Sequence, residues 1–350
     1  MKSICHGSGS IAQRRRCDHS PILVRTRIQV GAASLIVLFG SIFCQIVFAA
    51  SSSVSDLLAR IESAPERLNY VGSFVYEYGG KMETIRIVHR ANSGEFGERL
   101  FSLTGPEREI IRTRESVWCY LPDQQFGIHE FRQLSGSVFS RIRSKQFNGL
   151  SETYRFILGR LDRVADRSAR RLTVKPRDDY RYGYELWIDE QSGLLLRSDL
   201  LDKSGEVIER YMFVDLEIGR QIQDFELSPR YPRDDFVWYG IGEGDKAETL
   251  ATNMAWRAAK LPKGFQLSVS LNRISPMDNA EMEQLVFSDG LASVSMFVKA
   301  ESSSNSLRGE TQMGGISVYS LKLGDYVVTT LGEVPMATVE MIAKNAKLIN

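Results

Sequence analysis

The sequence has few of the residues from which catalytic and metal sites are usually built. It contains four histidines and four cysteines among 350 residues. His89 and His129 lie in predicted strands without a nearby cysteine or paired acid, which is not the spacing of a metal site. Gly-x-Ser-x-Gly, P-loop and Ser-x-x-Lys motifs are missing. The glycines within residues 240–244 match part of a dinucleotide fingerprint, but they neither follow a strand nor open a helix. The sequence therefore predicts no enzyme activity, metal or cofactor.

Charge is absent from residues 31–50, directly after a strongly basic segment. The first 30 residues carry six basic side chains against Asp18 alone. A basic segment, an apolar run and then small residues is the order of a secretory signal. The sequence predicts export to the periplasm, with cleavage near Ala49 or Ala50. An uncleaved membrane anchor is the alternative, because both the basic segment and the apolar run are long for a signal.

Removal of this signal changes both the charge and the cysteine count. The mature chain keeps 38 basic and 42 acidic residues, a net charge of −4. A mildly acidic protein without a basic run is a poor nucleic-acid binder, so we expect no nucleic-acid partner. Cys119 is then the one remaining cysteine, so no internal disulfide can form. It is interpreted as a buried residue of an apolar strand rather than a nucleophile.

Strand periodicity is strong, and it is clearest in residues 180–218. Apolar and aromatic residues recur at every second position, and the Ser-Gly pairs at 192–193 and 204–205 have the chemistry of tight turns. This pattern predicts a three-stranded antiparallel meander. Further strands are predicted in residues 69–78, 81–90, 98–103, 109–113, 117–121, 128–131 and 164–174.

The predicted fold is α+β and mostly β. A sheet of about ten strands curls rather than staying open and flat. Short helices are predicted in residues 55–64 and 151–158, and residues 134–149 have no clear period and are expected to form a loop or lid. A curled sheet with helices across its mouth is expected to enclose an apolar cavity.

The pattern also predicts a division of the chain into domains. Residues 1–50 form the signal, 51–228 the curled-sheet domain, 229–252 a linker rich in Pro and Gly, and 253–350 a smaller α+β domain. Within the second domain, strands are expected in residues 265–274, 282–288, 291–298, 316–321 and 326–332. Asp289-Gly290 is expected to form the hairpin turn between residues 282–288 and 291–298. A polar loop is expected in residues 302–310 and a closing helix from about Pro335.

Aromatic residues on the predicted strands are the candidate ligand site. Ordinary core packing is the simpler explanation for them, and the alternative is that some line a cavity for an acyl chain. These lipid-cavity candidates are Phe74, Tyr76, Trp118, Tyr120, Phe131, Tyr184, Trp187 and Tyr211. A second set consists of candidate anchors for a protein partner, because aromatics near a domain boundary are hard to assign to a core. This set is Trp238, Tyr239, Trp256, Asp289 and Gly290.

Several segments jointly carry a resemblance to a known family, and none of them has catalytic chemistry. They are Leu68-Asn-Tyr-Val-Gly-Ser-Phe-Val-Tyr76, Glu98-Arg-Leu100, Arg108-Glu-Ile-Ile-Arg112, Cys119-Tyr-Leu-Pro-Asp123, Tyr180-Arg-Tyr-Gly-Tyr-Glu-Leu-Trp-Ile-Asp189, Ser288-Asp-Gly-Leu-Ala-Ser-Val-Ser295 and Gly332-Glu-Val-Pro335. With these segments, nearly all of the mature chain resembles the RseB/MucB family of periplasmic sigma-E regulators.

This resemblance implies a first domain similar to the carriers LolA and LolB, a half-barrel wrapped on helices. It also implies that the protein binds the periplasmic part of a membrane-bound anti-sigma factor similar to RseA or MucA. Such a regulator shields its partner from a site-1 protease, and lipid or lipopolysaccharide fragments release it. A periplasmic lipid or lipoprotein carrier is the alternative function, based on the curled aromatic sheet alone. Self-association into a homo-oligomer is left open.

Overall fold

The computed structural model describes residues 53–91, 96–131, 147–240, 254–275, 280–301 and 309–349. The predicted signal, most of the predicted lid and most of the predicted polar loop lie outside these ranges. Among the described residues, no helix combines the length and the apolar character needed to cross a membrane.

Helix α1 (Val54–Arg67) opens the described chain. Ser53 caps it: the Ser53 hydroxyl accepts a hydrogen bond from the Asp56 amide at 3.1 Å, and the Asp56 carboxylate accepts one from the Ser53 amide at 3.1 Å. Such reciprocal capping satisfies two amides that have no partner within the helix. The helix predicted over residues 55–64 is present, but its predicted bounds were too narrow, because the helix begins at Val54 and continues through Pro65 to Arg67.

A sheet of twelve strands forms the larger domain, in the order β12-β6-β5-β4-β3-β2-β1-β11-β10-β9-β8-β7. Two antiparallel meanders, β1–β6 and β7–β11, join where β1 pairs with β11. The parallel pair β12–β6 extends one edge. The strands are β1 (Tyr70–Tyr78), β2 (Lys81–Arg90), β3 (Gly97–Ser102), β4 (Glu109–Thr113), β5 (Ser116–Leu121), β6 (Phe126–Phe131), β7 (Tyr154–Val164), β8 (Arg167–Pro176), β9 (Gly183–Asp189), β10 (Leu195–Leu201), β11 (Val207–Ile218) and β12 (Val237–Gly240).

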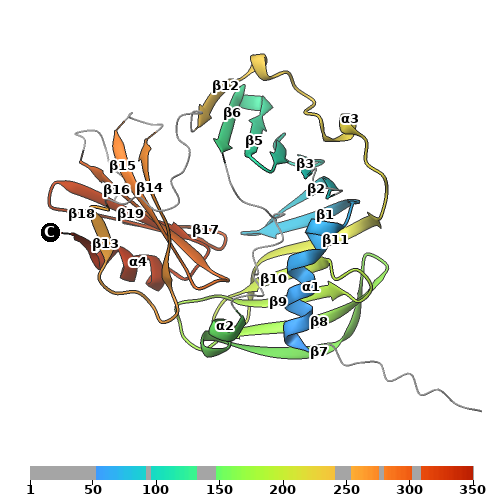
Figure 1. The fold of residues 1–350 in the computed structure, drawn as a ribbon, viewed down its shortest axis with the longest axis horizontal. Helices are drawn as coiled ribbons and strands as arrows, with labels where there is room; N and C mark the ends of the chain where they lie inside the picture. The colour runs from blue at the N-terminus through green and yellow to red at the C-terminus, as the bar shows by residue number, and fades with distance from the viewer. Residues whose placement is uncertain are drawn as a thin grey trace, which may run out of the picture. The chain divides into compact units, whose positions relative to one another are not determined.

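The sheet curls around α1, as Figure 1 shows. Strand β7 contacts both α1 and β11, although three strands lie between β7 and β11 in the sheet. The apolar face of α1 packs into the concave side, where it forms the main core with residues of both meanders. Buried residues of α1 in this core are Leu57, Leu58, Ile61 and Ala64. The predicted mostly-β fold with a large curled antiparallel sheet is confirmed.

The smaller C-terminal domain is also α+β, as predicted. Its six strands lie in the order β14-β15-β16-β19-β18-β17, and α4 packs on β18, β19 and β16. Its core includes Trp256, Phe287 and Ile342. The elements are β13 (Trp256–Ala258), β14 (Gln266–Ile274), β15 (Glu281–Ser288), β16 (Ser293–Ala300), β17 (Gly309–Met313), β18 (Ile316–Leu323), β19 (Tyr326–Gly332), α4 (Met336–Lys344) and β20 (Ala346–Leu348), with β13 paired to β20.

Two local predictions differ from the structure. The predicted helix over residues 151–158 was wrong, because α2 (Phe147–Thr153) ends there and β7 begins at Tyr154. Tyr154 and Phe156 alternate onto the core side of β7, which a helix would not allow. In addition, part of the expected linker forms β12 and pairs with β6. The remaining short helices are α3 (Asp224–Leu227) and the 3₁₀ turns Pro122–Gln124 and Arg233–Asp235.

Candidate functional site

Four of the lipid-cavity candidates face the main core under α1. Phe74 is buried within that core, and Tyr76, Tyr184 and Tyr211 pack against it. The rings of Tyr76 and Tyr211 stack with centroids 4.6 Å apart across the β1–β11 pair. The Tyr76 hydroxyl donates to a Glu209 carboxylate oxygen at 3.0 Å. Burial, with the nearby Tyr211 and Glu209, raises the pKa of Tyr76, so the phenol stays protonated and acts as a donor.

Trp187 lies in a different cluster from these four residues. Its neighbours Leu186 and Ile188 belong to the main core, whereas Trp187 packs with Val164 and other residues of a separate cluster. Successive strand residues point to opposite faces of a sheet. The guanidinium of Arg197 lies 4.1 Å from the Trp187 ring centroid. The structure therefore places Trp187 apart from the residues under α1.

Trp118 and Tyr120 meet Trp238 at the β12 edge of the sheet. The Trp238 ring stands edge-on to both, with centroids 5.0 Å from Trp118 and 4.9 Å from Tyr120. Trp238 also covers Gly127, where an added Cβ would lie 2.4 Å from its ring atoms. Trp238 is thus packed on the sheet, whereas the next residue, Tyr239, keeps 43% of its surface exposed. Phe131 ends β6, and its side chain lies outside the described residues.

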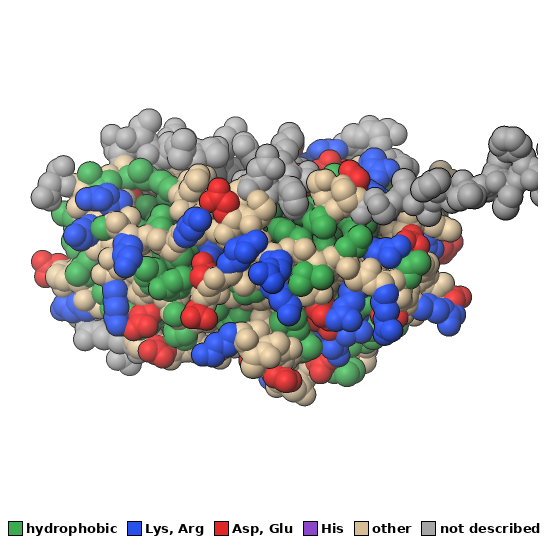
Figure 2. All heavy atoms as spheres, turned by 90° about the horizontal axis from the view of Figure 1, so that it is seen from below, with side chains coloured by type: hydrophobic (Ala, Val, Ile, Leu, Met, Phe, Trp, Pro, Cys, Tyr) green, Lys and Arg blue, Asp and Glu red, His purple; other side chains and the backbone are tan. Residues whose placement is uncertain are grey.

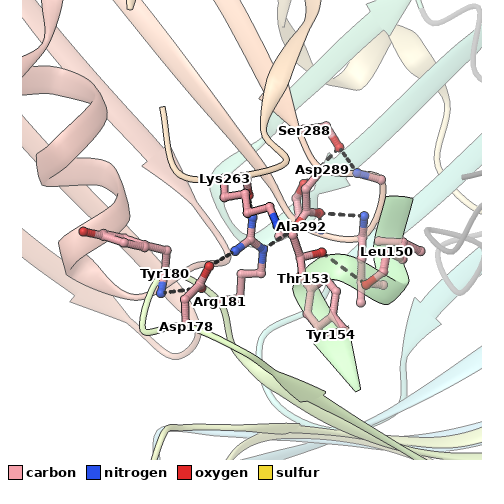
Figure 3. A network of polar contacts seen from close by, with 12 residues as sticks. Leu150, Thr153, Tyr154, Asp178, Tyr180, Arg181, Lys263, Ser288, Asp289 and Ala292 are labelled. Carbon is pink, nitrogen blue, oxygen red and sulfur yellow. Dashed lines mark hydrogen bonds and ion pairs between the residues drawn. The ribbon is translucent and has the colours of Figure 1, made fainter. Parts of the chain in front are cut away.

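The domain junction is built around Arg181, which precedes β9. Its side chain is fully buried and forms ion pairs with Asp178 and with Asp289 of the C-terminal domain. Its third hydrogen bond goes to the carbonyl oxygen of Lys263. The Tyr154 hydroxyl donates to the same Asp289 oxygen at 3.0 Å, as Figure 3 shows. A buried charge needs such partners, since an unpaired one would be costly to desolvate.

Asp289 and Gly290 form the turn between β15 and β16. The second carboxylate oxygen of Asp289 accepts hydrogen bonds from the Leu291 amide at 2.9 Å and the Ala292 amide at 2.8 Å. Gly290 has a φ of +100°, which a glycine adopts without strain. Asp289 therefore organises its own turn and binds Arg181 at the same time. Trp256, by contrast, is buried in the C-terminal core.

Two further contacts join the domains. Glu209 of β11 accepts a hydrogen bond from the Gly315 amide at 2.6 Å. The Thr338 hydroxyl of α4 donates to the Tyr180 carbonyl oxygen at 2.7 Å. Sequence analysis identified the Asp289-Gly290 turn but missed Arg181 and Glu209. Both residues lie at positions between the apolar residues of an alternating strand pattern, where a charged side chain usually faces solvent, so the sequence carried no local signal for their burial.

A buried polar cluster also fixes the end of α1. His89 and Glu98 are both fully buried and lie 2.9 Å apart, and Arg112 donates to the other Glu98 oxygen at 3.0 Å. The second ring nitrogen of His89 lies 2.6 Å from the Pro65 carbonyl oxygen in the last turn of α1. The two ring nitrogens of His89 therefore link Glu98 of β3 to the last turn of α1.

Comparison with known protein families gives one consistent result over the described domains. The model for the MucB/RseB N-terminal domain matches residues 53–231. The model for the MucB/RseB C-terminal domain matches residues 251–347.

Curated proteins and solved structures agree with these matches. The chain is 33% identical over 315 residues to the sigma factor AlgU regulatory protein MucB of Pseudomonas aeruginosa, covering 89% of this chain and 95% of that protein. It is 28% identical over 311 residues to the sigma-E factor regulatory protein RseB of Escherichia coli, covering 86% and 94%. The structure of the P. aeruginosa MucA/MucB complex matches with a TM-score of 0.65 at 30% identity, covering 85% of this chain and 99% of that one. The crystal structure of MucB with MucA(peri) matches with a TM-score of 0.64 at 31% identity, covering 85% and 100%.

Proposed function

The chain belongs to the MucB/RseB family, and from that premise we propose that it is a periplasmic negative regulator of an envelope-stress sigma factor. It binds the periplasmic part of a membrane-bound anti-sigma factor. The observation that carries the proposal is the match to MucB solved together with MucA, which spans 99% of that MucB chain with a TM-score of 0.65. The match covers 85% of this chain and therefore includes both domains.

Binding shields the anti-sigma factor from a site-1 protease in this proposal. An extended segment held on a folded surface cannot enter a protease active site, so protection follows from binding alone. Tyr239 supports a role in such contacts, because it remains 43% exposed beside Val237, which is 61% exposed on the same strand. The remaining partner-site residues, Trp256, Asp289 and Gly290, support the domain arrangement from within, since Trp256 and the Asp289 carboxylate are buried.

Lipid or lipopolysaccharide fragments release the partner in this proposal. The concave aromatic face around Phe74 is the proposed acyl site, and α1 now packs on it. An acyl chain could enter only if α1 shifts away from this face. The chain would then lower the affinity for the anti-sigma factor only if it binds the protein with shifted α1 more tightly than the protein with packed α1. Such a shift would break the His89 contact to the last turn of α1 and expose the buried apolar residues of the helix.

Protease protection tests both parts. Residues 51–350 are mixed with the periplasmic segment of MucA and a site-1 protease, with and without lipopolysaccharide fragments. Protection that lipid relieves supports the whole proposal. Protection that lipid does not affect supports the regulator function and rejects release by lipid. Absence of both protection and binding rejects the regulator.

A periplasmic lipid or lipoprotein carrier is the second candidate function. The curled sheet with its aromatic concave face favours it. A carrier would bind a fluorescent fatty acid or an acylated peptide and transfer it to acceptor vesicles, without affinity for the anti-sigma segment. N-terminal sequencing of the exported protein would show whether the leader is cleaved near Ala49 or Ala50 or kept as an anchor.

A further inference from the structure

We propose that the free edge of β7 is a docking site for an extended acidic segment of the partner, which adds as a further strand. The proposal rests on the proposed function and names the surface that this function uses. In the described part of the chain, β7 ends the large sheet and pairs with β8 alone. An unpaired edge offers a row of backbone amide and carbonyl groups to another chain.

The edge of β7 is unusually apolar for a solvent-facing strand. Ile157, Leu158 and Leu161 are 42%, 40% and 45% exposed. Natural proteins usually protect such an edge, since exposed apolar edge strands promote aggregation. The strand does carry one protective feature, a bulge between Leu158 and Leu161. Leu158 pairs with Leu172 and Leu161 with Arg170, so β7 has one more residue than β8 between the two pairs. The bulge divides the edge, so an added strand can pair continuously only along one arm.

The arm from Tyr154 to Leu158 carries an uncompensated pair of positive charges. Arg155 lies directly opposite Lys175 of β8, and both are exposed. Neither forms an ion pair with any residue that the structure describes. Like charges directly opposite each other destabilise a strand pair. A carboxylate of an added strand would relieve this repulsion, which favours an acidic occupant.

Charge also argues against a second copy of this chain as the occupant. Strand β7 carries Arg155, Arg160 and Arg163 against Asp162 alone. Pairing of β7 with itself would therefore bring arginines together. Figure 2 views the molecule from the side where β7 and β8 run in Figure 1, and it shows Lys and Arg side chains standing among hydrophobic ones.

The position of this arm links it to the domain junction. Tyr154 begins β7 and donates to Asp289 of the C-terminal domain. Glu152, two residues earlier, forms an exposed ion pair with Lys263 at 3.2 Å. An extended segment on the Tyr154–Leu158 arm would start beside both domains, so one partner chain could contact both.

The test uses residues 51–350 and the periplasmic segment of MucA as the probe. The double variant Arg155→Glu/Lys175→Glu should lose roughly tenfold or more in affinity, and the loss should shrink at high salt. The matched control Lys81→Glu/Lys203→Glu makes the same change in net charge at two other exposed positions, the first residue of β2 and the turn between β10 and β11. It should bind within about twofold of the unaltered protein.

Hydrogen exchange in the complex separates strand addition from simple charge attraction. Amides of residues 155–158 should gain protection when the segment binds, while amides of β12 at the opposite edge should not. The proposal is overturned if the segment binds but amide exchange in residues 155–158 does not change. It is also overturned if the double variant binds the segment with full affinity. Either result leaves the regulator function standing. Protection that appears in the free protein as its concentration rises assigns the edge to a second copy and also overturns it. If the unaltered protein does not bind the segment at all, the proposed function fails first.

Discussion

Replacement of Arg181 by Met should loosen the domain junction strongly. Met fills much of the same volume but removes the partners of Asp289, Asp178 and the Lys263 carbonyl oxygen. The Asp289 carboxylate is only 1% exposed, so it becomes a buried charge without a cation. Breaking one partner of a buried ion pair costs about 3–5 kcal/mol. The lower end is expected here, because Tyr154 and two turn amides still donate to Asp289.

A second substitution tests whether the buried charge is the cause. Asp289→Asn keeps an oxygen for the Leu291 and Ala292 amides but removes the charge. In the Arg181→Met background it should therefore recover about 1–2 kcal/mol, although in the unaltered protein it should be destabilising. A change of sign of this kind arises only when two residues act as one unit.

Urea unfolding of residues 51–350 gives the free energies, with hydrogen exchange of β15 and β16 as the local measurement. Arg163→Met is the matched control, because its ion pair with Asp166 is 75% and 82% exposed and should contribute under about 1 kcal/mol. The reasoning is refuted if Arg181→Met costs less than about 1 kcal/mol. It is equally refuted if Asp289→Asn further destabilises the Arg181→Met variant.

Three other predictions follow from described contacts. Burial acts to raise the pKa of Glu98, but the hydrogen bonds and charges of His89 and Arg112 outweigh it and hold the pKa below the ordinary 4.5. The ionised Glu98 therefore stabilises the folded state above about pH 4.5, and this stabilisation is lost as the pH falls through the folded-state pKa. Glu98→Gln should be less stable than the unaltered protein at pH 7, and its free energy of unfolding by urea should fall less steeply as the pH is lowered. An equally steep fall in both proteins would contradict this. Trp238→Leu should cost about 1–3 kcal/mol and release the amides of β12 to exchange, whereas unchanged protection there would show that the ring does not hold the strand. Glu209→Ala removes the acceptor of the Gly315 amide and the carboxylate acceptor of the Tyr76 hydroxyl, and it should cost about 2–4 kcal/mol. Tyr76→Phe should cost less, about 1 kcal/mol, and equal losses in thermal unfolding would locate the effect elsewhere.

Local sequence patterns predicted most of the sheet. The alternation in residues 180–218 and its two Ser-Gly turns correspond to β9, β10 and β11, which pair in that order. The same reasoning failed at residues 151–158, where the spacing of Tyr154, Ile157 and Leu158 also fits one face of a helix. Short apolar runs fit both periods, and here pairing with β8 decides between them.

The candidate site was less predictable because its contacts join distant parts of the chain. Arg181 and Asp289 are 108 residues apart, and nothing local to either residue indicates the other. His89 and Glu98 are only nine residues apart, yet their burial depends on α1 packing over both strands. The Asp289-Gly290 turn was predicted from its residue types, whereas its role at the junction follows only from the tertiary structure.

The pairing of β1 with β11 has a consequence for how the chain folds. Each meander can form from neighbouring strands, but Tyr76 and Glu209 on the joining strands are 133 residues apart. Closing a loop of that length costs about 4 kcal/mol of chain entropy, so this pairing is expected to form late and to limit the folding rate. Until it forms, the inner edges of both half-sheets are open to strands of other chains. The stacked Tyr76–Tyr211 rings stabilise the join where the entropic cost is greatest.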